Sequence, residues 1–116
     1  MACKNGKCEL SGQIRRLREA GMAAFRAGET GQAETLLRQA VDAAEAGGGI
    51  NVVTAQSTYK LALVLHEAGR HDEAAEQFEK ALALVRGRAG CGSKLYRTIL
   101  GEFAQALSVR ACAVGQ

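Results

Sequence analysis

Tryptophan and proline are both absent from this chain of 116 residues, and aromatic residues make up only 4% of it. The apolar core must therefore be built from alanine, leucine and valine, a composition that favours closely packed helices. Without proline, glycine and capping side chains must set the ends of those helices. No segment alternates apolar and polar residues as a half-buried strand would, so we expect no β-sheet.

Long hydrophobic runs are missing as well. No run approaches the roughly 18 apolar residues that cross a bilayer, and Met1–Cys8 lacks the apolar stretch of a secretory signal. We therefore expect a cytoplasmic protein that does not contact a membrane. The net charge of +3 arises from interspersed acids and bases. Because there is no basic block with aromatic stacking partners, we expect no binding to nucleic acid.

Four cysteines are the first residues that could carry metal or redox chemistry. Cys3 and Cys8 are separated by four residues, unlike the tighter pairs of zinc sites. The neighbouring Lys4 and Lys7 favour the reactive thiolate form. We expect no metal and no cofactor, and we keep Cys3 and Cys8 as candidates for a metal or redox site.

The two histidines, His66 and His71, have no catalytic motif around them. We expect both to pack structurally. The glycine run Gly47–Gly49 is not followed by the Lys-Ser or Lys-Thr of a phosphate loop. The sequence therefore predicts no catalytic residues, and we do not expect an enzyme.

Five segments carry apolar residues at helical spacing. Glycines end several of them, and serine, threonine or aspartate can cap their starts. The expected helices run over Ser11–Ala27, Thr30–Ala46, Asn51 or Thr54 to Ala68, Asp72 to the Gly87–Gly92 stretch, and Ser93–Arg110.

An internal repeat indicates how these helices are organised. Ala27–Val41 and Ala68–Leu82 superimpose without gaps, with Gly28 and Gly69 standing 41 residues apart. A period in this range is typical of stacked helix–turn–helix units.

The repeated residues resemble the tetratricopeptide repeat, a helix–turn–helix unit of about 34 residues. The resemblance covers residues 14–107. In the first unit the matching residues are Ala20, Gly21, Ala24, Gly28, Ala33, Leu37 and Ala40. In the second they are Leu61, Ala62, Leu65, Gly69, Ala74, Phe78 and Ala81. The family's tryptophan is replaced by Leu17 and Thr58, and its closing proline is missing.

The resemblance implies an all-α superhelix of about two and a half units of an extended variant. Its five helices would form two helix–turn–helix units and a capping helix. In that last helix, Leu100-Gly101 resembles the Leu-Gly of a first repeat helix. We expect a flexible arm over residues 1–10, the repeat domain over 11–110 and a tail over 111–116.

The family's concave face implies a groove for a partner protein or peptide. Counted from the matched small residues, that face should carry Arg15, Arg18, Met22, Phe25, Tyr59, Lys60, Leu63, His66, Thr98 and Glu102. Basic groups beside an apolar floor suit an acidic partner. Our interpretation is a non-catalytic adaptor, scaffold or assembly factor. Two alternatives stay open: a metal- or redox-responsive protein using Cys3 and Cys8, and a repeat scaffold that associates with itself into a homo-oligomer.

Overall fold

The computed structural model describes residues 7–47, 52–89 and 93–114, with side chains for Leu10 and for 12–47, 52–87 and 93–106. Within these ranges the chain is all-α, as the sequence predicts. Its five helices are α1 (Lys7–Arg26), α2 (Thr30–Ala46), α3 (Val52–Glu67), α4 (His71–Ala89) and α5 (Lys94–Val114).

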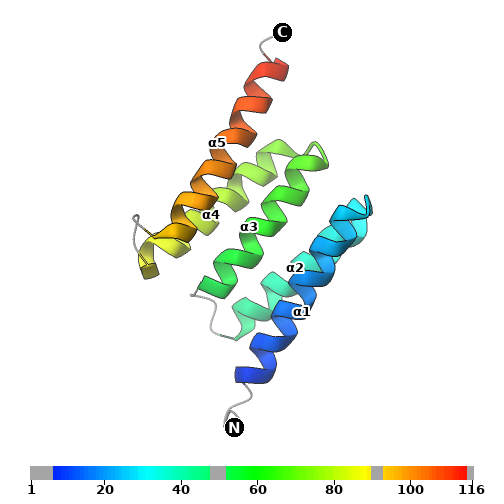
Figure 1. Ribbon diagram of the computed structural model, residues 1–116, viewed down its shortest axis with the longest axis vertical. Helices are drawn as coiled ribbons and strands as arrows, with labels where there is room; N and C mark the ends of the chain where they lie inside the picture. The colour runs from blue at the N-terminus through cyan, green and yellow to red at the C-terminus, as the bar shows by residue number, and fades with distance from the viewer. Residues whose placement is uncertain (1–6, 48–51, 90–92, 115–116) are drawn as a thin grey trace.

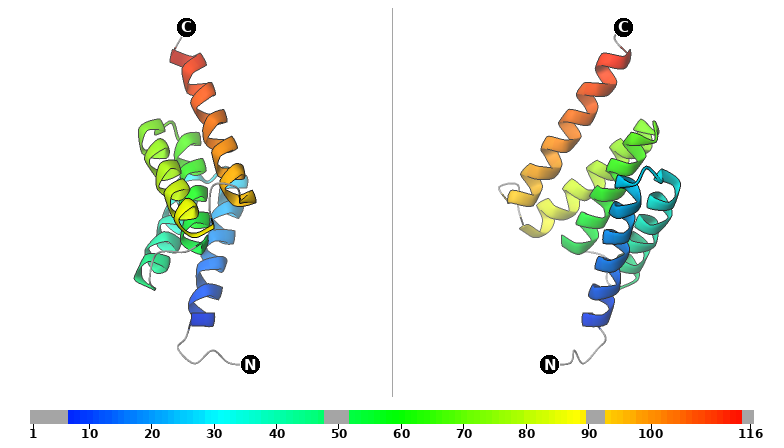
Figure 2. Two further views of the ribbon diagram at one scale, coloured as in Figure 1. Left: turned by 90° about the vertical axis from the view of Figure 1, so that its left-hand side faces the viewer. Right: turned by 45° about the vertical axis from the view of Figure 1, so that its right-hand side comes forward.

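The helices form two layers (Figure 1). In that view α1, α3 and α5 lie in front, with α2 and α4 behind them. Each helix packs on the next one along the chain, and α1 also contacts α3. Seen edge-on, α1 and α5 stand farther forward than α3 (left panel of Figure 2). The front layer is therefore concave, with α3 at its floor.

The turns inside the two units are built identically. Gly28 and Gly69 take φ values of 85° and 84°, a left-handed conformation that favours glycine. The N–H groups of Glu29 and Arg70, which follow these glycines, donate to carbonyls of the last turns of α1 and α3, those of Ala24 and Leu65. Each helix thus ends in a Schellman motif, which explains why the glycines recur at the same register.

Small residues set how closely the helices cross within a unit. A Cβ atom built on Gly21 would lie 2.7 Å from the Cγ of Leu37 and 3.4 Å from the carbonyl oxygen of Ala33. In the second unit, Ala62 and Ala74 are buried at the matching positions. Gly21 therefore allows α1 and α2 to cross closely.

The core is centred on Phe78, which is fully buried. Phe103 of α5 stacks on its ring at 5.1 Å between centroids, and Tyr59 of α3 tilts against it at 6.3 Å. Helix α3 also buries Thr54 and Thr58, and the Thr58 hydroxyl donates to the carbonyl of Thr54. Central α3 is covered on several sides, so even these two hydroxyl side chains are buried.

Helix bounds differ from expectation at both ends of the chain. Helix α1 begins at Lys7, four residues before Ser11. Leu10 contributes to this early start, because it packs beside Ile14 and Ala44 and lies against Gly47 at the end of α2. Helix α5 continues to Val114. Cys3 and Cys91 lie outside the described residues, as do the side chains of Cys8 and Cys112.

Helix α5 starts at the expected cap. The Ser93 hydroxyl accepts a hydrogen bond of 3.1 Å from the backbone N–H of Tyr96. Leu100 and Gly101 lie on an open side of the helix. Leu100 is 45% exposed, and a Cβ on Gly101 would meet nothing within 4 Å. The same helix packs Ile99 and Phe103 against the core, where Phe103 stacks on Phe78.

None of the helices, over the residues described, combines the length and apolar character needed to cross a membrane.

Candidate functional site

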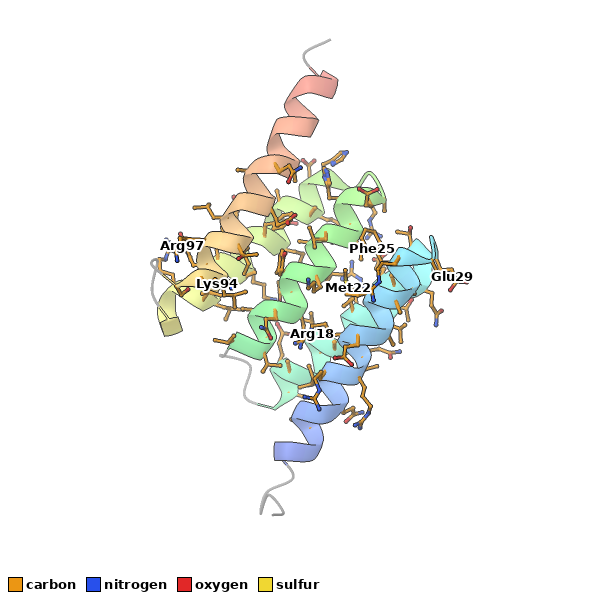
Figure 3. The ribbon with its side chains drawn as sticks, in the orientation of Figure 1. Arg18, Met22, Phe25, Glu29, Lys94 and Arg97 are labelled. Atoms are coloured by element: carbon orange, nitrogen blue, oxygen red, sulfur yellow. The ribbon has the colours of Figure 1, made fainter. Side chains whose placement is uncertain are left out.

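One wall of the concave face is a stripe on α1. Arg18, Met22 and Phe25 recur at the spacing of one helical face. They follow the side of α1 that faces α3 (Figure 3). Met22 and Phe25 are partly buried against the main core. The Arg18 guanidinium donates to the Gln56 side chain of α3 at 3.1 Å. Arg15, one turn earlier, is exposed.

The floor comes from α3, and one of its expected groove residues belongs to the core. Tyr59 is only 6% exposed and packs on Phe78. Its neighbour Lys60 places its ammonium 4.8 Å from the Tyr59 ring centroid, a cation–π contact. Leu63 and His66 are partly exposed on the same helix. The floor is therefore apolar, with one cation lying over it.

A pocket of about 370 Å³ lies at one end of the concave face. All three front helices line it: Phe25 from α1, Leu63, His66 and Glu67 from α3, and Glu102, Gln105 and Ala106 from α5. Thr98, the other residue expected on α5, is exposed and does not line the pocket. Lys94 and Arg97 lie on the side of α5 away from α3 (Figure 3).

The charges of this surface influence one another. Burial lowers the pKa of the Lys60 ammonium; Arg18 and Arg26 lower it further, while Glu102 partly offsets them. Burial also lowers the pKa of Arg18, with Glu19 opposing this effect and Arg15 adding to it. Burial raises the pKa of Tyr59, and Glu102 adds to that effect. Arg18 and Lys60 are thus partly desolvated on the concave face, and the charge of Glu102 acts on Lys60.

The sequence did not predict several residues of this surface. Gln56 and Arg26 border the cations of the first two units, and Glu67, Gln105 and Ala106 line the pocket. Glu67 lies four residues after Leu63, on the same face of α3, so the helical count could have found it. The α5 residues depend on how that helix is rotated about its axis, which its contacts with α4 decide.

The convex layer is electrostatically different. Arg70 pairs with Glu34 at 2.6 Å and with Glu73 at 2.7 Å, while Arg38 pairs with Glu34 at 2.9 Å and with Glu73 at 3.5 Å. Lys80 pairs with Glu45 at 2.8 Å. These ion pairs join α2 to α4 and to the turn before it. Arg38, Arg70 and Lys80 are therefore neutralised within the chain.

The two histidines meet at the turn between α3 and α4. Their Nδ1 atoms lie 3.0 Å apart, and both rings are partly buried. The expected packing role is consistent with this contact. Among the described side chains, no group of three or more histidine, cysteine, aspartate or glutamate residues is arranged to hold a metal ion.

The tetratricopeptide repeat family matches residues 13–87, more than half of the chain. The chain therefore belongs to the tetratricopeptide repeat family, as the repeated residues predicted. No curated protein and no solved structure matches it. Repeats of this family generally mediate protein–protein interaction and are typically non-catalytic.

Proposed function

We propose that this chain is a non-catalytic adaptor that holds an acidic segment of a partner protein in the groove formed by α1, α3 and α5. The segment would lie along Arg18, Met22 and Phe25 and cross the floor at Lys60 and Leu63. Phe25 and Leu63 would supply apolar contact, and the cations would supply attraction for carboxylates.

One observation supports this proposal above the others: the direct contacts of Arg18 and Lys60 in the groove are with neutral groups, whereas three convex cations contact carboxylates. Arg18 is held by a carboxamide and Lys60 by an aromatic ring. On the convex side, Arg38, Arg70 and Lys80 are each bound to a carboxylate of the same chain. A partner carboxylate would therefore gain more by pairing with Arg18 or Lys60 than with the convex residues.

The partial desolvation of Arg18 and Lys60 is a second reason to expect an acidic partner. Arg18 and Lys60 are partly buried, so each pays a cost for keeping its charge away from water. An incoming carboxylate offsets that cost, and it does so in surroundings where the effective dielectric is lower than in bulk water. The proposal therefore favours partner segments rich in aspartate and glutamate.

The test starts with affinity capture from the native host and identification of the partner by mass spectrometry. Binding to the Arg18→Glu variant is then measured by calorimetry at low and at high salt. We expect strong weakening at low salt and less at high salt, because a charge at the groove acts largely through screened attraction.

Arg86→Glu is the matched control, since it makes the same change of charge at an exposed position of α4. Each variant must melt like the parent before its affinity is interpreted. If Arg18→Glu and Arg86→Glu weakened binding equally, the loss would come from the change of net charge and not from the groove. A loss seen only with the convex variants Arg38→Glu or Glu79→Lys would move the binding site to the α2 and α4 face and overturn the groove assignment.

A further inference from the structure

We propose that the pocket between α1, α3 and α5 receives a lysine or arginine side chain of the bound segment. The partner would then carry a basic residue at a fixed interval from the acidic residues held at Arg18 and Lys60. This assignment rests on the proposed function, because the pocket lies at one end of the same groove. It replaces a uniformly acidic partner segment with one that carries both charges.

The pocket has room and apolar surface for the stem of such a side chain. Its volume of about 370 Å³ lies at the lower end of the range of ligand-binding pockets. Phe25, Leu63 and Ala106 supply apolar surface from all three front helices. Lysine and arginine lay their methylene groups along such surface while the charged head stays at polar groups. The Phe25 ring can also attract a cation placed over its face.

The charged groups at this pocket are acidic. Glu67 from α3 and Glu102 from α5 line it, and the titratable group beside them is His66. Among the described side chains, neither carboxylate forms an ion pair. Glu102 acts on the pKa of Lys60, but it does so without direct contact. A basic side chain entering the pocket would therefore meet two carboxylates that have no ion-pair partner in the described chain.

Two helix ends favour a cation at the same place. Phe25 lies one residue before the end of α1, and Glu67 is the last residue of α3. The C-terminal end of a helix carries partial negative charge, which favours a cation nearby. Of the chain's own cations at this end, Arg26 does not line the pocket and Arg70 is paired on the convex side. The pocket is thus suited to a cation that comes from the partner.

The helices also fix the interval between the two charges of the partner. Phe25 follows Arg18 by seven residues on the side of α1 that faces α3 (Figure 3), and Glu67 follows Lys60 by seven residues on α3. Seven helical residues rise by about 10.5 Å. An extended segment covers that distance in about three residues, at roughly 3.3–3.6 Å each. We therefore expect the basic residue about three positions from an acidic one.

The experiment uses two blocked synthetic peptides and the full chain. The first peptide is Asp-Glu-Ala-Ala-Lys, and the second has norleucine in place of lysine, which keeps the apolar stem and removes the charge. Each is titrated into the isotope-labelled protein and followed by NMR. We expect the lysine peptide to bind about fivefold more tightly, the size of two surface ion pairs acting together. It should also shift the resonances of Phe25, Leu63 and Ala106.

Variants locate the residues that recognise the charge. Glu67→Gln and Glu102→Gln should each reduce the preference for lysine, and together they should abolish it. Glu76→Gln is the matched control, because it makes the same change at an exposed position of α4 and should keep the preference. Arg18→Glu should weaken both peptides alike and leave their ratio unchanged. Thermal denaturation checks that every variant is folded.

Equal affinities for the two peptides would overturn the pocket assignment and leave the proposed function standing, provided that Arg18→Glu still weakens both. A preference for lysine that survives in the double glutamine variant would also overturn the assignment. If neither peptide binds at millimolar concentration, the acidic-segment groove fails together with the pocket. A dimer that dissociates in Glu102→Gln, detected by analytical ultracentrifugation, would show that a second copy of this chain fills the pocket instead.

Discussion

At the scale of single residues, two glycines in helices have opposite surroundings. A Cβ on Gly21 would lie 2.7 Å from the Cγ of Leu37, and Leu37 is fully buried and cannot easily shift. A Cβ on Gly101 would meet nothing within 4 Å. The same substitution to alanine should therefore change stability in opposite directions at the two positions.

We predict that Gly21→Ala lowers the free energy of unfolding by about 1 kcal/mol, because overpacking of roughly 1–3 kcal/mol exceeds the gain in helix propensity. Gly101→Ala should raise it by up to about 1 kcal/mol, since only propensity acts there. Urea denaturation of both variants beside the parent measures the two effects. A stabilised Gly21→Ala would show that α1 and α2 are not in close contact at this residue.

At the scale of elements, the start of α5 depends on one side chain. Ser93 accepts a hydrogen bond from the Tyr96 backbone N–H, which would otherwise lack a partner at the helix start. Ser93→Ala should lower stability by about 1 kcal/mol, whereas Ser93→Asp should preserve most of it. The comparison is made by thermal denaturation. Equal melting temperatures for the parent and the alanine variant would mean that this cap contributes nothing measurable.

The ion pairs between α2 and α4 predict a pH dependence. Burial raises the pKa of Glu34, but hydrogen bonds from Arg70 and Arg38 outweigh it and place the pKa below its ordinary value of 4.5. The hydrogen bond from Arg70 likewise lowers the pKa of Glu73. Carboxylates with lowered folded-state pKa values stabilise the fold above their unfolded value. This contribution is lost as the pH falls through the lower folded value.

The free energy of unfolding should therefore decline below pH 4.5, and Glu34→Gln should decline less steeply than the parent. Because these pairs are largely exposed, salt should weaken the effect. Chemical denaturation between pH 3 and pH 7, at low and high salt, measures both trends. If the free energy of unfolding fell equally with pH in the parent and in Glu34→Gln, Glu34 would not contribute to the pH dependence.

The elements also differ in how far their sequence predicts them. The first four helices and their glycine turns follow from periodicity and from the 41-residue repeat, because Gly28 and Gly69 need a left-handed backbone. Burial of Thr54 and Thr58 does not follow, since a helix covered on several sides has no polar face for a pattern to reveal. The rotation of α5 was predicted only in part, since Glu102 lines the pocket and Thr98 does not. It is decided by contact between Phe103 and Phe78, which are far apart in sequence.

At the scale of the whole molecule, the two layers separate two kinds of polar surface. The convex layer uses its charges to hold α2 and α4 together, and the concave layer combines cations with an apolar floor. The family resemblance predicted most residues of that floor, but it could not tell that Tyr59 faces Phe78 in the core. A Tyr59→Ala variant would therefore report on folding as much as on binding, and another residue must test the apolar part of the groove.

Phe25 is suited to test the apolar part of the groove, because it lines the pocket and is only partly buried. If the groove binds a partner segment, Phe25→Ala should weaken binding by about 1–2 kcal/mol, as expected for an aromatic anchor. The loss should appear mainly in the dissociation rate and should persist at high salt, unlike the effect of Arg18→Glu. Surface plasmon resonance at two salt concentrations separates these contributions.

Ala106→Ser is the matched control for this variant, because it alters the pocket wall on α5 by a single hydroxyl group and leaves the aromatic ring in place. We expect it to bind nearly as well as the parent. A Phe25→Ala variant that keeps the parent's melting temperature and the parent's dissociation rate would leave the pocket without a role in binding. The proposed contact would then be confined to the stretch of groove around Arg18 and Lys60, where the attraction is electrostatic and a high salt concentration alone should release the partner.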